Sequence, residues 1–213
     1  MEIIEPIVQI LFINLLLSGD NAIVIAMASR NLPEHLQGKA IRWGTFAAIG
    51  LRILFTFLMI YLLNLPFIQL IGGILLLMVA YNLLVDKPEE KNIKSGESLR
   101  AAVTIIIFAD LIMSLDNVLA IAAIADSNML LIIAGVILSI PIILYASEVI
   151  LKGIQKYPII IYIGAALLAW TAGNMMLKEN LFHASKMAEL LFLNGITLTI
   201  LLVGGVRRKG ISK

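Results

Sequence analysis

The sequence has no cysteine, and only 14% of its 213 residues carry a charge. Without cysteine, a disulfide framework, a thiolate metal site and a redox dithiol are all excluded. The sequence also contains only six prolines and no low-complexity tract, which argues against long disordered segments. Because the net charge is only +2, we expect no nucleic-acid partner.

Hydrophobic residues, in contrast, make up 61% of the chain, and the mean hydropathy is +1.00. A soluble domain is typically about 45–50% apolar and about 25% charged. The composition therefore predicts an all-α, polytopic membrane protein whose main partner is the lipid bilayer. Residues 1–5 lack the basic segment of a signal peptide, so we expect the first apolar run to remain in the mature protein.

Seven apolar runs are long enough to be membrane-spanning helices, which need about 20 mainly apolar residues each. They cover about residues 5–28, 41–63, 66–85, 100–125, 129–150, 157–177 and 188–206. One clearly hydrophilic connection, about residues 86–99, separates the third run from the fourth. We expect a single membrane domain.

The Lys and Arg residues predict how this domain is oriented, because basic residues concentrate in cytoplasmic connections. If the N-terminus is outside and the C-terminus inside, thirteen of the sixteen basic residues lie on the inner side. Only Lys178 and Lys186 lie outside, and Arg52 falls within the second span. The prediction is therefore N-outside and C-inside.

Two polar segments interrupt the apolar runs, and they resemble each other. Ser-Gly-Asp-Asn at 18–21 and Ser-Leu-Asp-Asn at 114–117, here called the first and second Asp-Asn motifs, are 96 residues apart. An Asp within a membrane span is costly unless it faces protein, water or a cation. For the Ser and Asn residues, hydrogen bonding between helices is an alternative role. The repeated Asp suggests that two halves meet at one site.

Further matches extend the repeat: Pro66 corresponds to Pro158, and Asn82 corresponds to Asn174. Each half contains three spans, so the second half must enter the membrane from the opposite side. This inverted 3+3 arrangement is common in secondary transporters, whose substrate site lies near the bilayer midplane. The first repeat covers about residues 5–86, a cytoplasmic loop about 86–99, the second repeat about 100–178, and an extra helix about 188–206.

The motifs carry hard oxygen donors, which suit Mg²⁺, Ca²⁺ or Mn²⁺. Asp20, Asn21, Asp116 and Asn117 are the candidate ligands, and the two carboxylates would balance a divalent charge. Asp110 could add a third carboxylate. Six helical residues correspond to about 600°, so Asp110 and Asp116 point about 120° apart. Both would reach one ion only if the helix were unwound at residues 114–115.

The repeat also pairs two charged positions, Arg52 with Glu148. They could form an ion pair across the pseudo-two-fold axis, or each could act in a separate gate. A third alternative is that both side chains extend from helix ends toward the membrane surface.

With these motifs in about seven apolar spans, the chain resembles the TerC family of bacterial integral membrane proteins from about residue 6 to 206. The resemblance implies export of Mn²⁺ across a bacterial plasma membrane, with no permanent cofactor. It implies that Asp20, Asn21, Asp116 and Asn117 bind the ion, with Asp110 as an acidic helper. Members often carry a further carboxylate in the first motif helix, where this chain has Asn14.

Other functions remain open. An intramembrane aspartyl protease would use two aspartates, but the Asn after each Asp and the lack of a Gly-x-Gly-Asp motif speak against it, so we expect no enzyme. The chain could instead be a membrane scaffold or metal-delivery subunit of the secretion machinery. It could also transport Ca²⁺ or another cation. Association into a homo-oligomer is a further possibility that the sequence does not decide.

Overall fold

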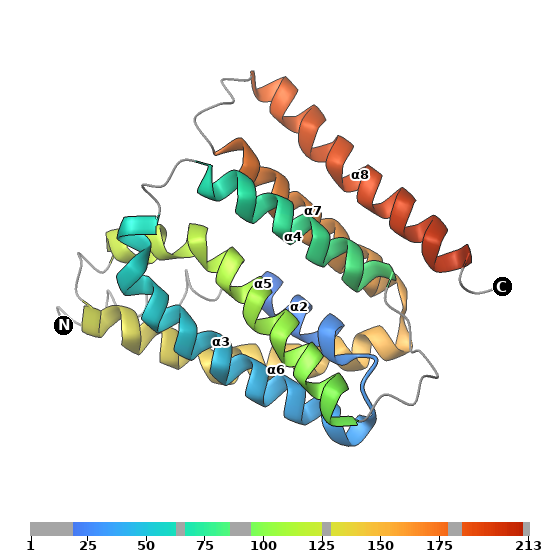
Figure 1. Cartoon of the computed structure of the whole chain (residues 1–213), viewed down its shortest axis with the longest axis horizontal. Coiled ribbons are helices and arrows are strands. Elements are labelled where there is room, and N and C mark those ends of the chain that lie inside the picture. The colour runs from blue at the N-terminus through green and yellow to red at the C-terminus, as the bar shows by residue number, and fades with distance from the viewer. Residues whose placement is uncertain (1–18, 63–66, 86–94, 125–128, 179–184, 211–213) are drawn as a thin grey trace.

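The computed structural model describes residues 19–62, 67–85, 95–124, 129–178 and 185–210, and these ranges are almost entirely helical (Figure 1). The helices are α2 (Gly19–Ser29), α3 (Glu34–Leu62), α4 (Ile68–Val85), α5 (Ser95–Ile124), α6 (Met129–Lys156), α7 (Ile159–Leu177) and α8 (Lys186–Gly210). Four of them, α4, α6, α7 and α8, contain a stretch long and apolar enough to cross a membrane. The expected all-α membrane architecture is therefore confirmed in its main features.

One boundary differs clearly from the expectation: α3 begins at Glu34, although the apolar run begins only near residue 41. The extra turns are amphipathic. Leu36 and Ala40 are buried and pack with Leu32 and with Ala102 of α5. Counting apolar residues misses such a helix end, because only one of its faces is hydrophobic.

The two halves of the chain run in opposite directions. The colours of Figure 1 show α2 running against α5, α3 against α6, and α4 against α7. The contacts have the same symmetry, because α3 packs on α5 as α2 packs on α6, while α4 and α7 pack on each other. This is the arrangement that an inverted repeat produces. The additional helix α8 packs on α7 and α4.

Small residues allow the central helices to come close together. A Cβ atom on Gly73 of α4 would lie 2.7 Å from the backbone oxygen of Ala172 in α7. A Cβ atom on Gly164 of α7 would lie 2.6 Å from the sulfur of Met27 in α2. Close approach at small residues is typical of helix packing in membranes, where van der Waals contact drives association.

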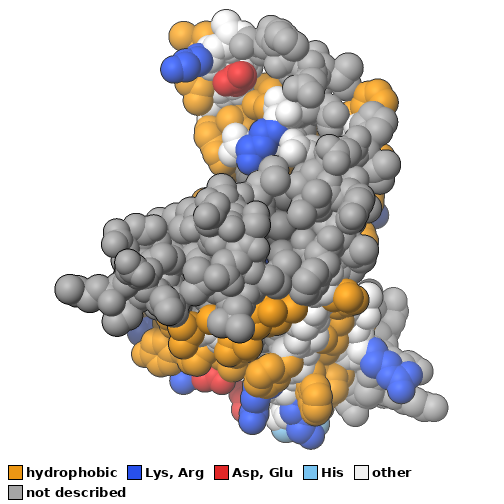
Figure 2. All heavy atoms as spheres, turned by 90° about the vertical axis from the view of Figure 1, so that its left-hand side faces the viewer, with side chains coloured by type: hydrophobic (Ala, Val, Ile, Leu, Met, Phe, Trp, Pro, Cys, Tyr) orange, Lys and Arg blue, Asp and Glu red, His pale blue; other side chains and the backbone are white. Residues whose placement is uncertain are grey.

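The outward surface of these helices is largely apolar. On the face that Figure 2 shows, hydrophobic side chains form much of the surface that the structure describes. Large exposed ones include Trp43, Leu54, Tyr145, Val149, Leu191, Leu202 and Val206. Large exposed apolar surfaces are unusual on soluble monomers and mark contact with a membrane or a partner.

The helix ends that carry basic residues lie together at one end of the bundle. The C-terminal ends of α2, α4, α6 and α8 lie at the same end of the bundle as the start of α3, α5 and α7 (Figure 1). Arg30, Arg42, Lys156 and Arg207 all belong to this end. The positive-inside rule predicts that this is the cytoplasmic end.

Because the chain has no native cysteine, single cysteines can test this orientation. Ser185 and Lys156 are exposed at opposite ends of the bundle. In intact cells, a membrane-impermeant maleimide should label Ser185→Cys at once and Lys156→Cys only after permeabilisation. The reverse order would show that the C-terminus is outside.

Candidate cation site

The first Asp-Asn motif places a buried amide beside a carboxylate on α2. The backbone N–H of Asn21 donates to Oδ1 of Asp20 at 2.9 Å. Asn21 is only 2% exposed, and within the described structure neither polar atom of its side chain has a hydrogen-bond partner. Leaving a buried polar group unsatisfied costs about 1–3 kcal/mol per group. The side chain of Asn21 is therefore suited to bind a ligand or water.

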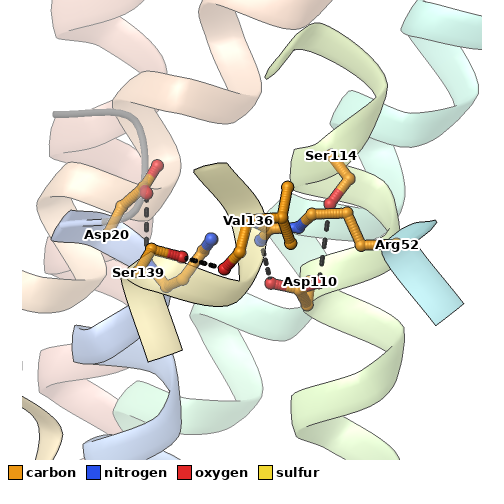
Figure 3. A network of polar contacts seen from close by, with 7 residues as sticks. Asp20, Arg52, Asp110, Ser114, Val136 and Ser139 are labelled. Carbon is orange, nitrogen blue, oxygen red and sulfur yellow. Dashed lines mark hydrogen bonds and ion pairs between the residues drawn. The ribbon is translucent and has the colours of Figure 1, made fainter. Parts of the chain in front are cut away.

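A buried ion pair lies across the bundle from this motif. The guanidinium of Arg52, on α3, donates to Oδ1 of Asp110, on α5 (Figure 3). The two side chains are only 1% and 8% exposed. The hydroxyl of Ser114 donates to the second carboxylate oxygen, Oδ2, at 3.5 Å. Both oxygens of Asp110 are thus in contact with donors of the protein itself.

Helix α6 contributes a polar position to the same region. Ser139 is buried, and its hydroxyl donates to the backbone oxygen of Val136 at 2.7 Å. In Figure 3, Asp20, Ser139 and the Arg52–Asp110 pair follow one another across the view. Pro141 lies inside α6 and has no N–H, so the carbonyl of Ile137 loses its usual helical donor.

Three helices bring charged groups into one region of the bundle. Asp20 on α2, Arg52 on α3 and Asp110 on α5 lie in one view of the polar network, in which Ser139 of α6 stands between Asp20 and the ion pair (Figure 3). Because Arg52 and Asp110 neutralise each other, the carboxylate of Asp20 is the group that is left to bind a cation. Two of the helices belong to the first half of the chain and one to the second.

Among the described residues that were predicted for the site, Glu148 lies away from it. The repeat suggested an ion pair between Arg52 and Glu148, but the partner of Arg52 is Asp110, and Glu148 is exposed on α6. The predicted pair is wrong because the repeat relates positions that are equivalent by symmetry. Equivalent positions need not touch, whereas α3 packs closely along α5.

The unwinding at residues 114–115 that Asp110 and Asp116 would need in order to share one ion is absent. Helix α5 continues from Ser95 to Ile124 without interruption. Ser114 lies one turn after Asp110 and donates to it instead of marking an unwound segment. The side chains of Asp116 and Asn117, like all of residues 1–18, lie outside the described part, so their role as ligands stays a prediction.

The described residues alone do not form a complete metal site. No group of three acidic or histidine side chains among them lies close enough to hold one ion. A full ligand set would therefore need Asp116, amide oxygens or backbone carbonyls in addition to Asp20 and Asp110. The sequence did not indicate that Asp110 is neutralised by Arg52, because their positions, 58 residues apart, follow no repeat offset.

These features define a helical integral membrane protein with a charged site buried between two inverted halves. The chain belongs to the integral membrane protein TerC family, whose pattern it matches over residues 1–210. This confirms the resemblance seen in the Asp-Asn motifs.

The chain is similar to several bacterial proteins. It is 47% identical over 167 residues to the uncharacterised membrane protein YjbE of Bacillus subtilis (strain 168), covering 78% of this chain and 77% of that protein. It is 31% identical over 153 residues to YceF of the same organism, covering 67% of this chain and 59% of that protein. It is 26% identical over 206 residues to the UPF0053 protein YegH of Escherichia coli (strain K12), covering 84% of this chain and 39% of that protein. No solved structure matches the chain.

The ion pair predicts strong coupling between its two members. Arg52→Gln or Asp110→Asn alone leaves a buried unpaired charge and should lower the free energy of unfolding by about 3–5 kcal/mol. The double variant should lose much less than the sum of the two. Unfolding in mixed micelles measures this cycle, with Arg42→Gln, an exposed arginine on the same helix, as the control. Additive losses would show that the two side chains do not interact.

Proposed function

We propose that this protein is a secondary transporter that exports a divalent metal cation, Mn²⁺ above all, from the cytoplasm of a bacterium. The observation that carries this proposal is the buried pair of Arg52 and Asp110 near the half-buried Asp20, a set to which both halves of the chain contribute (Figure 3). Ionisable groups inside a membrane are expensive and usually mark a path for ions or protons. Inverted halves that meet at such a site are typical of alternating access.

The available donors favour a hard cation. Asp20 supplies a carboxylate, and the buried amide of Asn21 supplies an oxygen with no protein partner among the described residues. In the proposal, Asp116 and Asn117 bind the ion from the second half in turn with Asp110 rather than together with it, because six residues of an unbroken helix leave the two carboxylates about 120° apart. Oxygen ligands of this kind suit Mn²⁺, Mg²⁺ and Ca²⁺, and the resemblance to the TerC family favours Mn²⁺ among them.

Alternating access requires contacts between the halves that can open and close. At the positively charged end, the side-chain amide of Gln155 on α6 donates to Oε1 of Gln37 on α3 at 3.1 Å. Gln37 also donates to the backbone oxygen of Leu32 at 2.9 Å. In the proposed cycle, the link between Gln37 and Gln155 breaks when the site opens to the cytoplasm.

Transport by the purified protein tests the proposal. In liposomes with Mn²⁺ on one side, the wild type should move Mn²⁺ down its gradient. Asp20→Asn and Asp116→Asn should each lower the rate by about tenfold or more, because each removes a charged ligand. Glu189→Gln, on α8 away from the site, removes a carboxylate as a matched control and should keep the wild-type rate. If liposomes that contain the wild-type protein moved no more Mn²⁺ than liposomes without protein, the proposal would be refuted.

A further inference from the structure

Arg52 is the least expected member of a cation site. It is a permanent cation, it is among the largest fully buried side chains, and it lies well inside the long helix α3. A cation fixed at this position repels any metal ion that enters. It also holds the carboxylate of Asp110, which would otherwise be available to the metal.

The contacts of the two aspartates differ in a way that gives them different roles. Asp110 has one oxygen on Arg52 and the other on Ser114. Asp20 receives a backbone hydrogen bond from Asn21 on Oδ1. A metal ion can therefore approach Asp20 first, whereas it can bind Oδ1 of Asp110 only after Arg52 has moved away.

We propose that Arg52 is a tethered counter-cation, which neutralises Asp110 while the site is empty and is displaced from it when a divalent ion binds. This inference rests on the proposed function and adds a residue that determines specificity. Arg52 comes from α3 in the first half and Asp110 from α5 in the second, so the exchange also makes or breaks a bond between the halves.

The exchange would select cations by charge. A monovalent ion brings the same charge as the guanidinium but is not attached to the protein, so it competes poorly for Asp110. A divalent ion brings twice the charge of the guanidinium and therefore competes better for Asp110.

The exchange would also allow the empty transporter to return to the conformation that is open to the cytoplasm. With Arg52 on Asp110, the second carboxylate is neutralised without any bound ion, so the halves can rock back across the membrane. Without Arg52, the empty site carries an additional uncompensated charge, which opposes this step. Exchange of Mn²⁺ for Mn²⁺ does not need the empty return and is therefore spared.

Two fluxes measured in liposomes separate these steps. Net Mn²⁺ flux requires the empty return, whereas exchange of radioactive Mn²⁺ for unlabelled Mn²⁺ does not. Arg52→Gln should lower net flux by about tenfold and keep exchange within about twofold of the wild type. It should also bind Mn²⁺ about fivefold more tightly or better, because a competing cation is gone. K⁺ should inhibit Mn²⁺ binding in this variant more than in the wild type.

Two further variants complete the design. Arg42→Gln removes an exposed arginine from the same helix and should leave both fluxes at the wild-type level. Arg52→Lys keeps the charge but loses the planar fork that matches a carboxylate. It should restore part of the net flux and still bind Mn²⁺ more tightly than the wild type. This affinity also tests the inference if Arg52→Gln fails to fold.

The outcomes distinguish the inference from the proposed function. If Arg52→Gln lowers both fluxes equally, or if the folded Arg52 variants bind Mn²⁺ more weakly, the ion pair only supports the structure and the inference is wrong. In that case the wild type still transports Mn²⁺ and the proposed function stands. If the wild type shows neither net flux nor exchange, the proposed function itself is wrong, and the inference falls with it.

Discussion

A guanidinium and a carboxylate buried together inside an apolar helix bundle are the constraint on which the rest of this structure depends. A charged side chain at the centre of a membrane-spanning helix costs about 2.5–3.5 kcal/mol on insertion scales. Arg52 and Asp110 can occupy their positions only because each neutralises the other. Their pairing requires α3 and α5 to stay in close contact, and this contact joins the two halves of the chain.

The inverted arrangement explains why a site forms at this junction. Opposed halves bring α2, α3, α5 and α6 together, and Gly73 and Gly164 allow the surrounding helices to pack closely. Asp20 then lies within electrostatic reach of the ion pair. Buried ion pairs add little net stability compared with well-packed apolar residues. In the proposed cycle, the role of this pair is the binding and release of an ion.

The sequence predicted much of the fold and only part of the site. Apolar runs marked the helices because lipid requires long hydrophobic segments, and the repeated Asp-Asn motifs indicated the two halves. Hydropathy missed the first turns of α3, since one face there is polar. The repeat gave Arg52 the wrong partner, because contact depends on which helices pack together. A single ion shared by Asp110 and Asp116 required unwinding at residues 114–115, but Ser114 bonds Asp110 within a continuous helix.

Binding of Mn²⁺ to the purified wild type, in competition with Ca²⁺ and Mg²⁺, tests most directly the claim that the buried aspartates hold a divalent cation. Electron paramagnetic resonance counts free Mn²⁺ and so gives the number of sites and their affinity. The account predicts one saturable site for Mn²⁺. Ca²⁺ and Mg²⁺ should displace Mn²⁺ from this site only weakly, and Asp20→Asn should abolish the site. Saturable binding that survives in Asp20→Asn, or no saturable binding in the wild type, would contradict it.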